Sequence, residues 1–200
     1  MPLLISTTFL IATYLFMPVY LQSSTPRDKA DAVILMVGYD NEMRRSAAKS
    51  LVKQGYARYL LIPANGKILL YDREKQRFQP IKAATPLKRK WVHQWQMGEF
   101  KCPENTQIEL MMGMEMMDRL GLKSAIVVSS PYHMRRIRMI LDHINRDSGK
   151  RFLLAPAGDS HGFDPKWVFD KDKIEWIFLE YAKIIWFQAY RSLDLCSSSG

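Results

Sequence analysis

The segment Ser129-Ser130-Pro131-Tyr132-His133, followed by Arg136, contains the residue types best suited to chemistry in this 200-residue chain. Ser130 is a good helix N-cap and Pro131 suits the first helical position, so a helix is expected to begin here. His133 then falls in the first turn, where the positive end of the helix dipole disfavours imidazolium. A neutral histidine can act as a general base, or as a donor to a substrate oxygen. Arg136 comes three residues later and shares that helix face.

Free backbone N–H groups at such a helix start add affinity for an anion, so these residues predict a phosphate or oxyanion pocket. A purely structural interpretation stays open beside it. In that interpretation His133 only forms hydrogen bonds within the loop, and Arg135, Arg136 and Arg138 form a solvated face.

Three further segments carry candidate site residues. Glu104 and Asn105 begin another predicted helix, where a carboxylate is often only a partner of the helix dipole. Arg44 and Arg45 lie in the first turn of an earlier helix, and the unfavourable position of either one there slightly favours a functional role. Asn65 ends a predicted strand, and Asp40 is expected to be an N-cap. The chain has no dinucleotide-binding glycine motif, no nucleophile-elbow motif and no His/Cys/Asp cluster with metal-ligand spacing.

Alternating strands and helices predict the elements that position these residues. Continuous apolar runs at 31–37, 59–64, 124–129 and 152–155 are typical of strands buried on both faces. Helices are expected at 42–54, 103–120, 131–144 and 171–191. This order predicts crossover units and a mainly parallel sheet, that is, an α/β fold. Ligands of such sheets bind beyond the carboxyl ends of the strands, where the candidate residues gather.

The basic segment at 67–101 interrupts this alternation. It carries nine basic and three acidic residues, which give +6 of the chain's net +9. Ile68–Tyr71 and Arg77–Ile81 are expected to pair as a hairpin, and the whole insertion is placed to cover a site. The net charge suits nucleic acid, a phospholipid surface or a phosphorylated small molecule, although solubility alone also accounts for it.

The first 26 residues contain no charged side chain. The apolar run at 1–21 is long enough to cross a bilayer as one helix, which predicts a single-pass membrane anchor. A buried core helix is the competing interpretation, because the run carries several Ser and Thr residues. One domain is then expected at 27–196, followed by a tail at 197–200. Arg27 and Lys29 after the span would leave that domain in the cytoplasm.

In this order, the motifs resemble a bacterial family typified by SanA, YdcF and ElyC (domain of unknown function 218). The most specific match is Ser129-Ser130-Pro131-Tyr132-His133-Met134-Arg135-Arg136. Cys102-Pro103-Glu104-Asn105, Ala30-Asp31-Ala32 and Arg44 also match, and Glu180 resembles a glutamate of the last helix. Departures occur at Cys102 and Ser129, where threonine is usual, and at Asn65-Gly66, which replaces a more glycine-rich turn.

The resemblance implies a Rossmann-like three-layer fold behind an N-terminal apolar helix. It also implies a phosphorylated or nucleotide-like ligand, such as a lipid-linked precursor, and a link to cell-envelope biogenesis. It assigns no reaction or cofactor, and it places the domain outside the cytoplasm, against the two-residue charge argument; we give it slightly more weight. His133 and Glu104 are the expected catalytic pair. The expected ligand-binding residues are Arg44, Asn65, Asn105, Ser129, Ser130, Tyr132 and Arg136.

Two alternative functions stay open. A non-catalytic envelope factor could dock on anionic lipid or on a partner protein through the basic insertion. Nucleic-acid binding through the same insertion ranks lowest, because one charged segment without a recognition fold is poor evidence.

Overall fold

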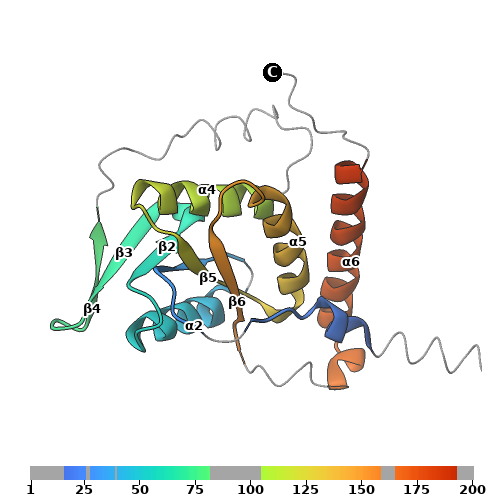
Figure 1. Ribbon diagram of the computed structural model, residues 1–200. Helices are drawn as coiled ribbons and strands as arrows, with labels where there is room; N and C mark the ends of the chain where they lie inside the picture. The colour runs from blue at the N-terminus through green and yellow to red at the C-terminus, as the bar shows by residue number, and fades with distance from the viewer. Residues whose placement is uncertain (1–15, 26–27, 39, 82–104, 159–164, 193–200) are drawn as a thin grey trace, which may run out of the picture.

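The computed structural model describes residues 16–25, 28–38, 40–81, 105–158 and 165–192. They form a mixed α/β fold around one six-stranded sheet with the strand order β4-β3-β2-β1-β5-β6 (Figure 1). The strands are β1 (Ala32–Leu35), β2 (Tyr59–Ile62), β3 (Lys67–Asp72), β4 (Arg77–Ile81), β5 (Ser124–Ser129) and β6 (Arg151–Pro156). The helices are α2 (Asn41–Lys53), α4 (Asn105–Arg119), α5 (Met134–Ile144) and α6 (Lys171–Ser192).

Four of the strands, β2, β1, β5 and β6, run parallel, as their continuous apolar sequences predict. β1 pairs in parallel with β2 and with β5, and β5 pairs in parallel with β6. All four residues of β1 are buried, and β5 is buried from Ala125 onward. Strands of this kind are covered by helices on both faces, which is why they lack alternating polar residues.

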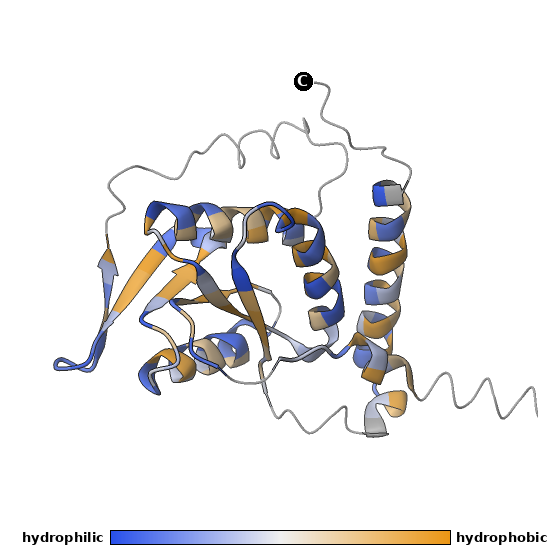
Figure 2. Ribbon diagram, viewed as in Figure 1, coloured by the Kyte–Doolittle hydropathy of each residue, from blue (hydrophilic) through white to orange (hydrophobic). Residues whose placement is uncertain are grey.

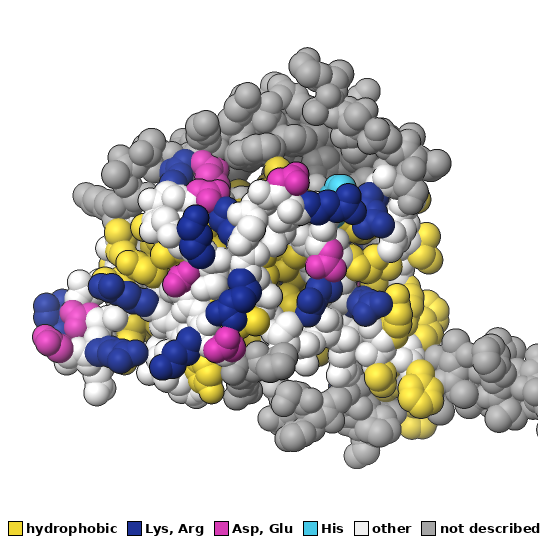
Figure 3. Space-filling view, viewed as in Figure 1, with side chains coloured by type: hydrophobic (Ala, Val, Ile, Leu, Met, Phe, Trp, Pro, Cys, Tyr) yellow, Lys and Arg dark blue, Asp and Glu magenta, His cyan; other side chains and the backbone are white. Residues whose placement is uncertain are grey.

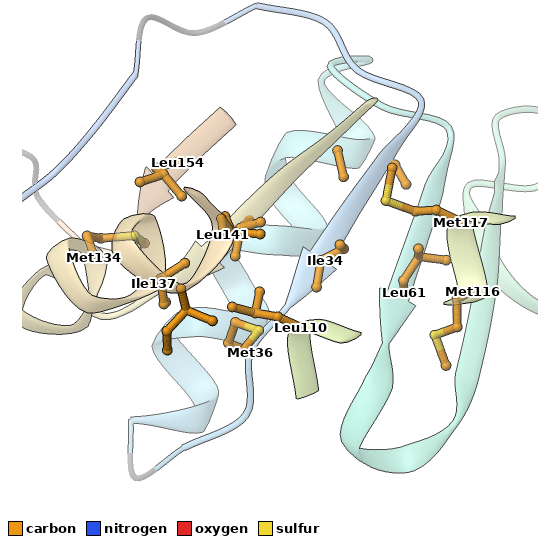
Figure 4. Close-up of a cluster of buried hydrophobic side chains, with 14 of the residues drawn as sticks. Ile34, Met36, Leu61, Leu110, Met116, Met117, Met134, Ile137, Leu141 and Leu154 are labelled. Atoms are coloured by element: carbon orange, nitrogen blue, oxygen red, sulfur yellow. The ribbon is translucent and has the colours of Figure 1, made fainter. Parts of the chain in front are cut away.

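Helices cover both faces of this sheet. On one face, side chains of β1, β2 and β5 pack with α4 and α5, and Figure 4 shows Ile34 and Leu61 beside Leu110 and Met116. On the other face, Val33 and Leu60 pack with Ala48 and Val52 of α2. Figure 2 shows the same pattern as apolar strands between helices that carry polar residues. On α4, Met112, Met116 and Met117 are buried in this core.

The described half of the basic insertion extends the sheet. β3 and β4 form the predicted hairpin, in which Asp72 pairs with Arg77. β3 also pairs antiparallel with β2 through the Pro63–Asn65 turn (η1) and Gly66, whose φ of 61° suits glycine. The expectation that the insertion covers the site is therefore wrong for 67–81, which lies at the sheet edge beyond β2. Residues 82–101 lie outside the described residues.

The described end of the N-terminal segment packs on the protein. Residues 16–21 are helical. Leu21 is fully buried in a cluster with Ile177 and Ile184 of α6, and the Tyr181 hydroxyl donates to the carbonyl of Met17. Among the described residues no helix is long and apolar enough to cross a membrane. Most of the expected anchor at 1–21 lies outside the described residues, as do both cysteines and Glu104.

Candidate functional site

The candidate site lies at the carboxyl ends of β1 and β5. These neighbouring strands continue in opposite directions across the sheet, because β1 leads through α2 to β2 while β5 leads through α5 to β6. The loops that follow the two strands therefore separate and leave a crevice between them, where side chains from both loops meet. Ligands of parallel sheets usually bind in such a crevice. The predicted convergence of loops is confirmed for the loops after β1 and β5 and for the first turn of α4.

The first group of side chains, which we call the Arg44 cluster, consists of Asp40, Arg44, Ser130 and Tyr132. Arg44 Nε donates to the Ser130 hydroxyl at 2.8 Å, and Nη1 donates to the Met36 carbonyl at 3.3 Å. The Ser130 hydroxyl donates to the Asp40 carboxylate, which also accepts from the Tyr132 hydroxyl at 3.0 Å. Arg44 is only 2% exposed, and Ser130 is fully buried. The first turn of α2 is thereby tied to the loop after β5.

Two predicted helix caps have a different role in this cluster. Asp40 and Ser130 do occupy N-cap positions, but neither side chain caps its helix. Instead, the two side chains face each other between the loops that follow β1 and β5. Ser130 accepts from the charged Arg44 guanidinium and the Asp40 carboxylate accepts from the Tyr132 hydroxyl, and hydrogen bonds that include a charged group are strong. The role predicted for Asp40 and the capping role of Ser130 are therefore wrong, although their place at the site rim is as expected.

The second group, which we call the Glu180 cluster, consists of Thr106, His133, Arg136, Glu180 and Lys183. Arg136 donates to both oxygens of the Glu180 carboxylate, at 2.8 and 3.1 Å, and to the Thr106 hydroxyl at 2.9 Å. His133 Nδ1 lies 2.9 Å from Glu180 Oε1, and Lys183 Nζ donates to the same oxygen at 3.0 Å. Glu180 is only 1% exposed. The predicted common face of His133 and Arg136 is confirmed, because both side chains contact this carboxylate.

The helix start around His133 differs from the expected one. Pro131–His133 form a 3₁₀ turn (η2), and α5 begins at Met134 with His133 as its N-cap residue. Pro131 occupies the first position as predicted, but the backbone N–H of His133 is already bonded to the Ser130 carbonyl at 3.0 Å. The N–H group of His133, which was expected to bind an anion, therefore already has a hydrogen-bond partner. This is common where a helix begins with a tighter 3₁₀ turn.

Burial and nearby charges fix the ionisation of these groups. Burial lowers the pKa of His133, although contact with Glu180 opposes this shift, so His133 is neutral as predicted. Burial alone would raise the pKa of Glu180, but its contacts with His133 and Arg136 hold that pKa well below its usual range. Burial raises the pKa of Tyr132 to about 12, so its hydroxyl is a neutral donor to Asp40.

Glu109 on α4 is a site residue that the sequence pattern marks only weakly. Its Oε1 accepts a hydrogen bond from the Val37 N–H at 2.9 Å, at the end of β1. Burial raises the pKa of Glu109 to about 7, and its backbone hydrogen bond and the charge of Arg44 limit that rise. A carboxyl group of this kind exchanges a proton near neutral pH. Its place one turn into the helix is only a weak sequence signal for a site role, because acidic residues are also common on the exposed surface of helices.

Other predicted site residues are placed differently. Ser129 is buried, and its carbonyl accepts from the Ala157 N–H. Asn65 and Asn105 are exposed and form no hydrogen bond with either cluster among the described side chains. Glu104 lies outside the described residues, and the carboxylate in contact with His133 is Glu180. In the part of the chain that the structure describes, no group of three or more His, Cys, Asp or Glu could hold a metal ion.

Comparisons of the chain with protein-family models, with curated proteins and with solved structures found no match. The function of the site is therefore argued from its own geometry.

Gly38 is the residue whose size this geometry restricts most. A Cβ atom added there would lie 2.3 Å from Arg44 Nη1 and 2.6 Å from Cζ. We therefore expect Gly38→Ala to displace Arg44 and to lower the free energy of unfolding by about 1–3 kcal/mol, measured by urea denaturation. In an Arg44→Ala background the same substitution should cost under about 1 kcal/mol. An equal cost in both backgrounds would show that the Arg44 contact is not the cause.

Proposed function

We propose that this protein binds a phosphorylated or nucleotide-like small molecule at the rim between β1 and β5 and hydrolyses or transfers its phosphate. The single observation that carries the proposal is the state of Arg44. Its guanidinium is buried beside the loop after β1, and its Nη2 has no hydrogen-bond partner among the described residues.

An unpaired donor at this depth is costly, by about 1–3 kcal/mol, and more when charged. A phosphate oxygen would satisfy it, because guanidinium groups form strong charge-assisted hydrogen bonds with phosphate. Gly38 favours access to the group, since it is exposed and lies against the guanidinium without a side chain. Arg44 is thus better placed to bind an anion than Arg136, whose guanidinium is engaged by Glu180 and Thr106.

His133 supplies a base in this proposal. We assign the proton of the neutral ring to Nδ1, because this atom lies 2.9 Å from the Glu180 carboxylate. Nε2 then keeps its lone pair and can accept a proton from a water or hydroxyl nucleophile. The Glu180 carboxylate lies beside this nitrogen, as a carboxylate does beside the histidine of a catalytic triad, although the Nδ1–H is not aligned on the oxygen in this structure. Arg44 holds the phosphate while His133 removes the proton from the attacking oxygen. As the new P–O bond forms, the P–O bond to the leaving group breaks, and the leaving oxygen takes up the proton from the His133 imidazolium or from water.

The wider proposal follows from the resemblance to the SanA, YdcF and ElyC family. This wider proposal is a Rossmann-like domain that acts outside the cytoplasm on a phosphorylated envelope precursor. It is held at the membrane by its N-terminal segment, of which residues 16–21 pack on the domain. Parallel strands with helices on both faces and a site at their carboxyl ends support this description. If the ligand is a phosphorylated lipid-linked precursor, a membrane anchor would hold the site close to the membrane in which that ligand lies.

A non-catalytic envelope factor is the second candidate. The observation that favours it is the Arg136–Glu180 pair, because it neutralises one of the two arginines predicted to bind phosphate.

The test uses the full chain in detergent with inorganic phosphate, nucleotides and undecaprenyl phosphate. We expect Arg44→Lys to weaken phosphate binding at least about tenfold, because lysine cannot reproduce the guanidinium geometry. His133→Asn should leave affinity within about threefold but lower hydrolysis at least about 100-fold. Arg45→Lys, the next position of α2, is the control. Binding by none of the three compounds, or equal loss in the control, would overturn the proposal; binding without hydrolysis would favour the second candidate.

A further inference from the structure

We propose that a second anion site, for a phosphate ester or diphosphate, lies in a basic groove at the opposite end of the sheet. The groove is lined by Lys29, Gly55, Tyr56, Arg58, Tyr71 and Arg73, together with apolar residues of α2 and of the strand approaches. Its volume is about 390 Å³, within the range of small-ligand sites.

The topology brings these residues together from three places in the chain. Lys29 precedes β1, and Gly55 to Arg58 connect α2 to β2. Tyr71 lies near the end of β3, which runs antiparallel to β2, so the turn that begins after Asp72 and contains Arg73 lies near the amino end of β2. The backbone N–H of Tyr71 donates to the Arg58 carbonyl at 3.5 Å, which joins the two walls. The groove therefore lies across the sheet from Arg44 and His133, which follow strand carboxyl ends.

The charge of the groove is strongly positive. Three basic side chains line it and no acidic one does. None of the three forms an ion pair with an acidic residue that the structure describes, and the nearby carboxylates have other partners. Asp28 pairs with Arg151, while Asp31 accepts hydrogen bonds from Lys123 and Ser124. Three uncompensated cations around one concave surface attract a multiply charged anion.

Gly55 sets the position of one of these cations. A Cβ atom at Gly55 would lie 2.9 Å from Arg73 Nη2, so the guanidinium lies directly on the glycine backbone. Gly55 also has a φ of 84°, which ends α2 and leaves its last carbonyls bonded by the N–H groups of Gly55 and Tyr56. The negative end of the α2 dipole is about half a charge, which three full cations outweigh.

The side chains of the groove also suggest the size and class of the ligand. Arg58 and Arg73 suit phosphate oxygens, which guanidinium groups bind in pairs. Tyr56 and Tyr71 are half-buried and add apolar ring surface beside the charges, which suits an organic group attached to the phosphate. A soluble phosphate ester and a phospholipid headgroup share this chemistry. Figure 3 shows basic side chains, with acidic ones among them, over the β3–β4 hairpin and α2 as over the rest of this face.

The test measures binding of inorganic pyrophosphate and a nucleoside diphosphate to the full chain by calorimetry, and sedimentation with vesicles containing phosphatidic acid. We expect Arg58→Ala and Arg73→Ala each to weaken binding at least about tenfold, and the double variant to abolish it. Both side chains are exposed, so the variants should remain folded, which circular dichroism checks.

Arg77→Ala is the matched control, because it removes one exposed cation from the same hairpin but not from the groove. It should change affinity by less than about twofold, as expected of an exposed charge outside the contact. All of these measurements are made in an Arg44→Lys background, which weakens the first proposed site, so the binding lost in Arg58→Ala and Arg73→Ala is separate from that of the proposed function. Vesicle binding alone would assign the phosphate to a lipid headgroup, and binding of the soluble compounds to a free ligand. No binding in either arm, or an equal loss in Arg77→Ala, would overturn the inference.

Discussion

Glu180→Ala is expected to lower the free energy of unfolding by about 3–5 kcal/mol, because it leaves the buried guanidinium of Arg136 without its counter-charge. Both partners are almost completely buried, at 1% and 4% exposure, and they share two hydrogen bonds. His133 loses its contact in the same variant. Urea denaturation at neutral pH measures the effect.

The matched control for this prediction is Glu175→Ala, an exposed glutamate on the same helix, which should cost under about 1 kcal/mol. A second variant separates lost charge from lost packing. Glu180→Gln combined with Arg136→Met should be more stable than Glu180→Gln alone, because no unpaired cation remains. If the double variant is the less stable of the two, the ion pair is not what stabilises this region.

The Glu180 pair also predicts a pH dependence. Because the folded protein holds the pKa of Glu180 below its usual value, the pair contributes stability above the ordinary glutamate range. That contribution is lost as the pH falls through the lowered pKa. The acid sensitivity of unfolding should therefore be smaller in Glu180→Gln than in the unchanged protein.

Glu109→Gln is expected to raise the free energy of unfolding at about pH 8, by up to about 3 kcal/mol. Burial raises the pKa of this carboxyl from 4.5 to about 7. The folded chain thus binds a proton more strongly than the unfolded chain, and its stability falls as the pH rises through about 7. Glutamine keeps an oxygen for the Val37 N–H and removes the buried charge.

The difference between the two proteins should disappear near pH 4, where the glutamate is protonated in both folded and unfolded chains. Glu175→Gln is the control, since this glutamate of α6 is exposed. It should change stability by less than about 1 kcal/mol. A stability gain for Glu109→Gln that is equal at pH 4 and pH 8 would exclude the raised pKa as its cause.

Local patterns predicted the fold well, because each depends on residues close in the chain. The continuous apolar run at 124–129 coincides with β5, and Gly55 and Gly121 follow the ends of helices at positive φ, which glycine adopts readily. The hairpin of β3 and β4 was also predictable, since its two strands are joined by a short turn. The pairing of this hairpin with β2 was harder to predict. Asn65-Gly66 was interpreted only as the end of a strand, whereas it forms the turn between β2 and β3.

The candidate site was predictable in location but not in its partners. Sequence spacing places His133 and Arg136 on one face whatever surrounds them. Glu180 lies 44 residues beyond Arg136 on another helix, and Asp40 lies 90 residues before Ser130. Side chains at that separation meet only if the sheet order puts their elements together, and local propensity does not contain that order.

By itself, the sequence determined the strands, the helices and the loop ends at which chemistry could occur, because hydrophobic period and turn residues act within a few positions. The tertiary structure alone decided which carboxylate each cation meets. It turned Asp40 and Ser130 from expected caps into partners across the sheet, paired Arg136 with Glu180, and left one nitrogen of Arg44 without a partner among the described residues. The physical reason is burial: removing these charges from water makes their pairing a property of the packed core, not of the local chain.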